Sequence, residues 1–211
     1  MDKSEIYERM KGRTPEQKKV IKYFNGLGGC LSAGLKDEDY EAIVMAIAKS
    51  TDFKQKALNK MGLDESQVNE IEPVHFEGYL FEAEAGCDMI CGKDKVWRSS
   101  KYQITWLFFS SSQIYLYQYT FNLNEDGKKE STQEYFYEDI TNFTTSSETV
   151  ERMVLDKVSC SGNRTSVRKN IDYNIFTIVV PGVQLNCSMV QNDLSEKSIQ
   201  GMKAKLREKK G

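Results

Sequence analysis

The chain has 211 residues, a formal net charge of −2 and 28% charged residues, with acidic and basic side chains interleaved. This length suits one large domain or two small ones, whose hydrophobic core needs neither disulfide nor metal to be stable. The balanced charge argues against a nucleic-acid-binding protein, and because no apolar run approaches the ~20 residues that cross a bilayer, we expect a soluble protein without a transmembrane segment.

The first third of the chain has the periodicity of amphipathic helices. Thr14 begins a capping-box sequence with proline at the first helical position, Asp64 begins another, and Asp37 or Asp39 is expected to cap a helix between them. The expected helices cover residues 14–25, 37–47, 51–62 and 64–72. Helices of this length are stable only when they dock on a neighbour. Residues 1–73 are therefore predicted to form a helical module.

After these helices the hydrophobic period changes towards two, which is typical of strands. Residues 102–140 form an antiparallel meander rich in aromatic and β-branched side chains. Its tyrosines Tyr115, Tyr117 and Tyr119 are expected to pack in the protein, not to form an exposed stacking surface. The expected strands are residues 74–85, 99–109, 113–123, 132–145, 149–159, 173–180 and 183–190.

The chain ends in an alternating hairpin and an amphipathic helix. Residues 183–189 alternate apolar and polar side chains after the turn at 181–182, so one face of this hairpin must be buried. After residue 192 a helix is expected, with a narrow apolar stripe of Ile199, Met202 and Leu206. Its last turn is basic, which complements the helix dipole. Seven strands and one C-terminal helix thus follow the helical module.

Three short motifs accompany this order of elements. Gly78-Tyr79-Leu80 lies in the first strand, Trp97 and Tyr102 flank the second strand's beginning, and Tyr137-Glu-Asp-Ile140 lies in the fourth. Together they resemble the pleckstrin-homology-like (PH-like) fold, a bent barrel of two sheets whose open corner is plugged by the last helix. The resemblance covers roughly residues 74–210. As a whole, the chain is similar to bacterial proteins that carry this barrel beside a small helical module.

The sequence therefore predicts an α+β protein of two domains. Residues 1–73 are the helical module, and residues 74–211 are a seven-stranded antiparallel PH-like β-barrel with a C-terminal helix. The five cysteines have no framework spacing, which favours reduced thiols and a location in the bacterial cytoplasm.

Catalytic or metal chemistry has little support in the sequence. Cys87 and Cys91 form one C-x3-C pair, whereas structural zinc usually takes two such pairs, so two loop thiols are the favoured interpretation. His75, the single histidine, is expected to be a partly buried sheet residue. We predict no catalytic residue, no metal site and no cofactor, and hence a protein that is not an enzyme.

Two hypotheses for function remain. The first is a binding or scaffolding protein that recognises a protein or peptide, because barrels of this kind offer an exposed strand edge and a groove beside the final helix. The alternative is an anionic ligand or phospholipid headgroup at the mouth of the barrel, where two basic loops are expected to approach each other. The candidate ligand-binding residues are Lys93, Lys95, Arg98, Lys101, Arg164, Arg168 and Lys169.

Overall fold

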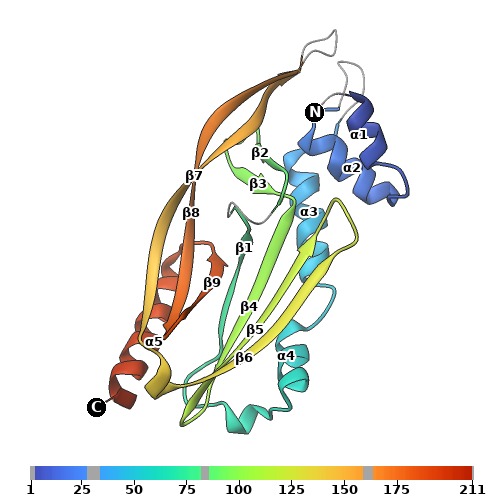
Figure 1. Ribbon diagram of the computed structural model, residues 1–211. Helices are drawn as coiled ribbons and strands as arrows, with labels where there is room; N and C mark the ends of the chain where they lie inside the picture. The colour runs from blue at the N-terminus through green and yellow to red at the C-terminus, as the bar shows by residue number, and fades with distance from the viewer. Residues whose placement is uncertain (1–2, 28–33, 82–85, 159–163, 211) are drawn as a thin grey trace.

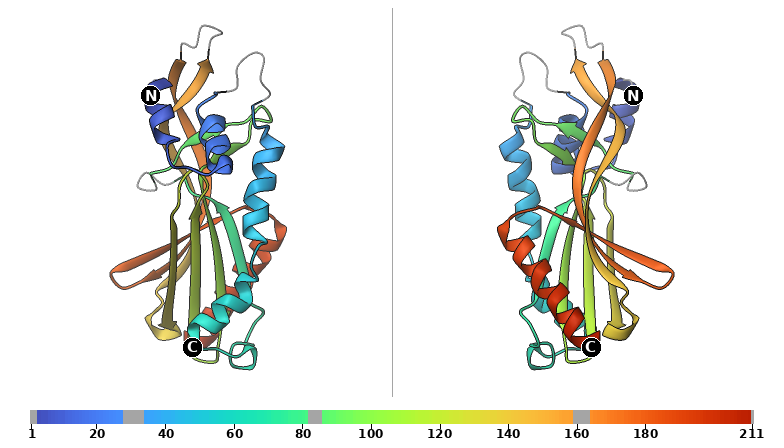
Figure 2. Two further views of the ribbon diagram at one scale, coloured as in Figure 1. Left: turned by 90° about the vertical axis from the view of Figure 1, so that its right-hand side faces the viewer. Right: turned by 90° about the vertical axis from the view of Figure 1, so that its left-hand side faces the viewer.

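The computed structural model describes residues 3–27, 34–81, 86–158 and 164–210, and these residues form three layers (Figure 1). Helices cover one face of a four-stranded antiparallel sheet, and a three-stranded sheet with the C-terminal helix covers the other (Figure 2). The helices are α1 (Lys3–Arg9), α2 (Pro15–Phe24), α3 (Asp37–Ala48), α4 (Phe53–Met61) and α5 (Asp193–Lys210). The strands are β1 (Val74–Tyr79), β2 (Met89–Cys91), β3 (Trp97–Ser99), β4 (Lys101–Phe109), β5 (Gln113–Asn122), β6 (Lys128–Phe136), β7 (Asn142–Val158), β8 (Arg164–Val180) and β9 (Val183–Met189).

Local capping signals place the helices. The Thr14 hydroxyl accepts the Gln17 backbone N–H, and the Gln17 side chain accepts the Thr14 N–H, so α2 begins where predicted. Asp64 caps only a single 3₁₀ turn, η1 (Glu65–Gln67), and the helix expected to continue to residue 72 is wrong. The reason is tertiary, because the Glu70 N–H donates to the Phe109 carbonyl at the edge of the sheet instead.

The first turn of α3 uses its acids differently from the prediction. Lys36 is the residue before α3, so neither Asp37 nor Asp39 is its cap. The Asp37 carboxylate instead accepts the Tyr23 hydroxyl at 2.8 Å and the Lys93 backbone N–H at 2.7 Å. The short helix α1 was not predicted; it buries Ile6 against α2 and offers too little pattern to be recognised.

Several expected strand boundaries are wrong, as for the strand expected at 132–145, which is β6 (Lys128–Phe136). Residues 142–158 are one continuous strand, β7, separated from β6 by the 3₁₀ turn η3 (Tyr137–Asp139). The strand expected to begin at residue 173 begins at Arg164, since it pairs with β7 along its whole length. Residues 82–85 and 159, which were also expected to be strand, lie outside the described residues.

The predicted seven-stranded closed barrel is wrong. The described strands form separate sheets in the orders β1-β4-β5-β6, β2-β3 and β7-β8-β9. Strand β9 lies close to β1, where a Cβ on Gly78 would come within 3.3 Å of the Met189 nitrogen. Side chains make the hydrogen bonds between these layers: Gln103 accepts the Ser188 N–H, and Gln118 donates to the Asn186 carbonyl. The sheets therefore pack as open layers, with the C-terminal helix present as predicted.

The two faces of the four-stranded sheet bury different side chains. Alternate residues of a strand point to opposite faces, and the tyrosines of β5 point towards the helices. Tyr117 is fully buried, Tyr115 and Tyr119 are partly buried, and Phe53 of α4 lies 4.8 Å from the Tyr119 ring. The expectation that these aromatics are packing residues is confirmed. The opposite face packs Leu107 and its neighbours against β8, β9 and α5.

The helices and the four-stranded sheet share one hydrophobic cluster. Tyr40 and Val44 of α3 and Leu58 of α4 pack with Tyr102 and Phe108 of β4. An α+β architecture is thus observed, with the first third of the chain docked on the sheet. The domain division between residues 73 and 74 stays a prediction.

Candidate functional site

A continuous groove runs between the first residues of β7 and the helix α5. Its wider part has a volume of about 620 Å³ and is lined by Thr141–Thr145 and by four residues of α5 from Lys203 to Lys210. Its narrower part, of about 270 Å³, lies between residues 145–147 of β7, neighbouring residues of β8 and β9, and the first half of α5. Because Thr145 and Lys203 line both parts, the two hollows join.

The strand wall of this groove is an unprotected edge. Within the described strands, β7 pairs with β8 on one side only. In an antiparallel pair, alternate residues turn their backbone N–H and C=O away from the partner. Edge strands are usually blunted by proline, charged residues or bulges. Residues 141–147 contain no proline or charged residue, Glu148 and Glu151 lie beyond the groove, and the one register shift lies between Leu155 and Lys157. The edge is therefore open to another strand.

The helix wall presents three cations towards β7. Asn192 and Ser195 cap the start of α5 through reciprocal hydrogen bonds of 2.9 and 3.0 Å. The buried stripe of Ile199, Met202 and Leu206 fixes the rotation of the helix. The residues that consequently line the groove, at a spacing of i, i+4 and i+7, are Lys203, Arg207 and Lys210.

Two cations on the other side of α5, Lys205 and Lys209, are neutralised. The Lys205 ammonium lies 2.5 Å from Glu70 and 2.9 Å from Glu208, and the Lys209 ammonium lies 3.1 Å from Glu70. Hydrogen bonds from the two lysines lower the pKa of Glu70, and those to its acids raise the pKa of Lys205. In the described part of the chain, the three groove cations form no such ion pair.

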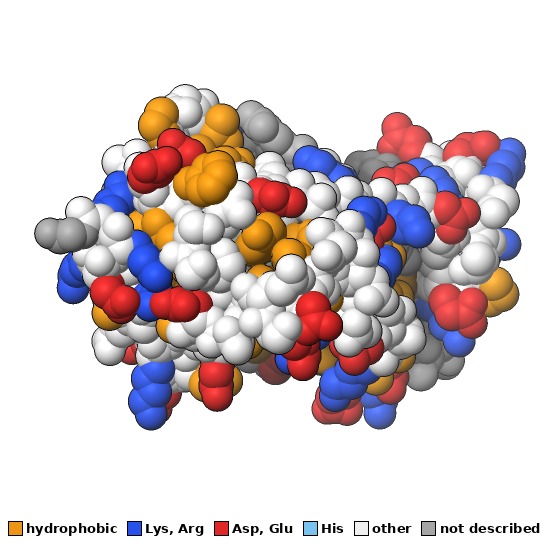
Figure 3. Space-filling model, turned by 90° about the horizontal axis from the view of Figure 1, so that it is seen from below, with side chains coloured by type: hydrophobic (Ala, Val, Ile, Leu, Met, Phe, Trp, Pro, Cys, Tyr) orange, Lys and Arg blue, Asp and Glu red, His pale blue; other side chains and the backbone are white. Residues whose placement is uncertain are grey.

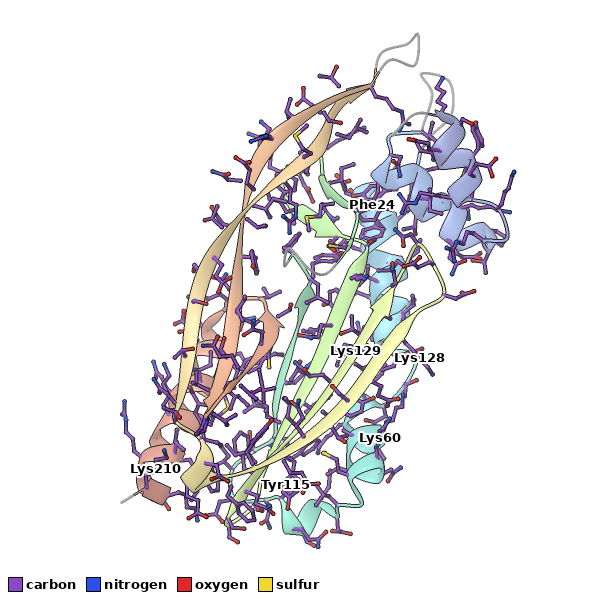
Figure 4. The ribbon with its side chains drawn as sticks, viewed as in Figure 1. Phe24, Lys60, Tyr115, Lys128, Lys129 and Lys210 are labelled. Atoms are coloured by element: carbon purple, nitrogen blue, oxygen red, sulfur yellow. The ribbon has the colours of Figure 1, made fainter. Side chains whose placement is uncertain are left out.

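The basic residues of α5 lie at one end of the molecule. Seen from below, acidic and basic side chains are interleaved over much of the surface, including the left end, where α5 ends (Figure 3). Lys210 lies at this end of α5, beside the first residues of β7 (Figure 4). Both Arg207 and Lys210 are exposed, whereas Lys203 is partly buried.

On the β2–β3 side of the predicted barrel mouth, one predicted cation is buried in ion pairs. The Arg98 side chain is 4% exposed, with Nε 2.7 Å from Glu41 and Nη2 2.7 Å from Asp94. Lys93 and Lys95 are exposed at the turn of the hairpin. Arg98 thus ties this hairpin to α3.

On the β8 side, the predicted cations point elsewhere. Arg164 donates to the Asn25 carbonyl, and Arg168 lies 3.2 Å from Glu151 in an exposed ion pair. Val167 packs towards the β2–β3 hairpin, so strand alternation places Arg168 on the opposite face. Lys169 is exposed. The two segments do meet, through apolar side chains, but the seven cations do not form one cluster; anion binding by those that are exposed stays a prediction.

A second hollow, of about 500 Å³, lies on the sheet face away from the helices. The register aligns Gln103, Thr120 and Lys129 in one row across β4, β5 and β6, and Lys101 lies one row further along. Lys101 is the one predicted cation that lines this hollow; Lys128 and Lys129 also line it and were not predicted. Lys128 and Lys129 lie at the start of β6 (Figure 4).

The groove cations on α5 were interpreted from sequence only as partners of the helix dipole. Their i, i+4, i+7 spacing beside the apolar stripe was the available signal for a basic helix face. That this face meets an open strand edge follows from contacts between β7 and α5, about 60 residues apart in sequence.

The sulfur and histidine candidates have ordinary surroundings. Cys87 and Cys91 are free thiols, and burial raises the pKa of Cys87. His75 stacks on Trp106 with ring centroids 4.6 Å apart, and partial desolvation lowers its pKa. The prediction that His75 is a sheet residue is confirmed, but its side chain is exposed at the surface, not partly buried. Among the residues that the structure describes, no three metal-ligating side chains of the His, Cys, Asp or Glu type gather at one place.

Comparison of the chain with protein-family models, with curated proteins and with solved structures finds no match. In the described ranges, no helix combines the length and the apolar character needed to span a membrane. The groove between β7 and α5 is therefore interpreted from its own geometry.

Proposed function

We propose that this chain is a non-enzymatic binding module that takes up an extended segment of a partner protein along the outer edge of β7. The observation that carries the proposal is the edge of β7 at residues 142–147, which pairs with no further described strand and lies beside a groove of similar length. A segment added there as a further strand gains backbone hydrogen bonds, and the groove beside it gives specificity.

The order of elements supports a PH-like assignment as part of this proposal. A four-stranded antiparallel meander interrupted by the β2–β3 hairpin is followed by a three-stranded meander and a C-terminal helix. Proteins of this kind offer a strand edge and a groove beside the final helix. Because fold likeness alone does not give function, the proposal depends on the groove and not on the family.

Selection of a random peptide library on the full chain tests this function. We expect enriched peptides to protect the backbone amides of residues 141–147 from hydrogen exchange. Thr145→Trp places a large side chain where the two parts of the groove join, and should weaken binding at least about tenfold. Thr149→Trp is the matched control, since Thr149 is an exposed residue of the same strand and face that does not line the groove.

Two results would contradict the proposal. One is a selection that enriches no peptide above background. The other is an enriched peptide that binds the Thr145→Trp variant as tightly as the unchanged protein, because such a peptide binds elsewhere.

The second hollow favours one further candidate, binding of a phosphate-bearing ligand. Its polar rows contain Lys101 and Lys129 together with the amides of Gln103 and Gln118. Vesicles of phosphatidylcholine with phosphatidylserine, sedimented with the protein at low salt, test this candidate with Lys129→Gln as the variant. If the protein does not bind the vesicles, or if Lys129→Gln binds them as well as the unchanged protein, this second candidate is wrong.

A further inference from the structure

We infer that the segment added to β7 is acidic, with Asp or Glu at alternate residues beside Lys203, Arg207 and Lys210. This inference rests on the proposed function and names the chemistry of its partner. The partner class is an extended acidic peptide.

The dimensions of the groove set the length of the segment. Thr141–Thr145 lie opposite the second half of α5, and residues 145–147 lie opposite its first half, so strand and helix run antiparallel along each other. From residue 141 to 147 the strand extends roughly 20 Å, and from 196 to 210 the helix extends roughly 21 Å. Such a groove accommodates about six residues of extended chain.

The charge along the groove is uneven. The residues of its wider part include three cations, and of the described residues that line it none is acidic. Glu138 and Asp139 precede this part in the chain but do not line it. The narrower part contains Glu196, which accepts a hydrogen bond from Gln191. An added segment therefore meets positive charge next to the beginning of β7 and little net charge next to Ser147.

The uncompensated charge explains why an acid is preferred to a neutral residue. Lys205 and Lys209, on the far side of the same helix, already have Glu70 as partner. Across the groove from the three cations of α5, the β7 side contributes Thr141, Asn142 and Thr144, which are polar but uncharged. Carboxylates of a partner would supply the missing negative charge.

The spacing of the cations matches alternate residues of a strand. Lys203 and Arg207 are separated by a rise of about 6 Å, and Arg207 and Lys210 by about 4.5 Å. Side chains at i and i+2 of a strand point to the same side and lie about 6.6 Å apart. An acid-x-acid pattern therefore places one carboxylate near each of two neighbouring cations, whereas adjacent acids point to opposite sides.

Fluorescence anisotropy with labelled seven-residue peptides tests the inference at low salt. The probes are Thr-Glu-Thr-Glu-Thr-Glu-Thr, its Gln and Lys counterparts, and an isomer with three contiguous glutamates. We expect the alternating Glu peptide to bind at least about tenfold tighter than the Gln peptide and about threefold tighter than the contiguous isomer, with no binding of the Lys peptide and weakening by added salt.

Charge reversal locates the effect. Lys203→Glu, Arg207→Glu and Lys210→Glu together should abolish Glu-peptide binding and allow the Lys peptide to bind. The matched control reverses three exposed lysines of α2, Lys18, Lys19 and Lys22, and so changes the net charge equally. Glu-peptide binding by this control should fall less than twofold.

The outcomes separate the two proposals. If Gln and Glu peptides bind equally well and both respond to Thr145→Trp, the acidic preference is wrong and the binding function stands. Equal losses in the two triple variants also overturn the acidic site, because the attraction is then only general charge. If neither these peptides nor any library peptide binds, the binding function itself fails.

Discussion

The β2–β3 hairpin contains three cations and the last eight residues of α5 contain five, yet the cations behave differently. In the hairpin, Arg98 is 4% exposed and held by Glu41 and Asp94. In α5, Lys203, Arg207 and Lys210 line an open groove without an acidic neighbour on its wider part. Their neighbours explain the difference, since the hairpin meets the acidic first turns of α3 and the groove meets a strand rich in Thr and Ser. The difference teaches that the availability of a cation is set by the elements packed against it together with the acids nearby in sequence, such as Asp94 beside Arg98.

The largest expected effect is on the paired side of this comparison. Arg98→Ala leaves Glu41 and Asp94 without their buried partner and should lower the free energy of unfolding by roughly 2–3 kcal/mol, less than for a fully buried pair because both acids are partly exposed. Arg168→Ala is the control. It removes an exposed pair with Glu151 and should cost less than about 0.5 kcal/mol. Urea unfolding measures both, and equal losses would remove the distinction between paired and available cations.

Gly92 tests how tightly the same network is packed. A Cβ at this residue would lie 2.5 Å from Asp94 Oδ1, 2.8 Å from Asp37 Oδ2 and against the Arg98 guanidinium. Gly92→Ala should therefore cost about 1–3 kcal/mol by displacing the network. Gly127→Ala is matched to it, since a Cβ there meets no atom within 4 Å, and its unfolding midpoint in urea should not fall. If Gly92→Ala does not change the free energy of unfolding, the hairpin can move to accommodate the added Cβ and the network is not tightly packed.

The features that could be predicted from sequence are those made within a few residues. The Thr14 and Asp64 capping boxes, the Asp52 cap and the Gly62 end of α4 all depend on neighbours in the chain. The aromatic meander and the amphipathic α5 also follow from local period. Contacts between distant segments could not be predicted in this way.

The wrong predictions have that common origin. Arg98 and Glu41 are 57 residues apart, so of the two acids that hold Arg98 the hairpin sequence alone offers only Asp94. The closed barrel failed because β9 meets the other sheet through the side chains of Gln103 and Gln118 instead of a strand ladder. From sequence, the groove could be expected only as a general property of the fold that the chain resembles. Which three cations line it depends on the rotation of α5, which is fixed by its buried residues.

Glu130 gives a smaller effect with a defined pH dependence. Burial alone would raise its pKa, but hydrogen bonds from Tyr117, Lys60 and Lys56 outweigh it and hold the pKa at about 2, below the ordinary 4.5. Because the folded-state pKa is depressed, the stabilisation is present above pH 4.5 and is lost as the pH falls towards 2. Glu130→Gln should cost about 1 kcal/mol at pH 7 and nothing near pH 2.

Urea unfolding between pH 7 and pH 2 checks this dependence. Glu134→Gln is the control, because Glu134 lies on the same face of β6, is exposed and forms no ion pair with the described residues. Its difference from the unchanged protein should stay constant with pH. A Glu130→Gln difference that persists at pH 2 would show that the lysines of α4 do not hold this carboxylate.

The smallest expected effect lies on the open side of the comparison. Replacing Lys203, Arg207 and Lys210 by Gln should change the free energy of unfolding by less than about 0.5 kcal/mol, because no acid in the described part of the chain loses a partner. Lys205→Gln, in the same helix, removes the ion pairs with Glu70 and Glu208 and should lower the melting temperature measurably. A triple variant that melts as early as Lys205→Gln would mean that the groove cations hold α5 in place. Unchanged melting together with lost acidic-peptide binding would separate stability from recognition within one helix.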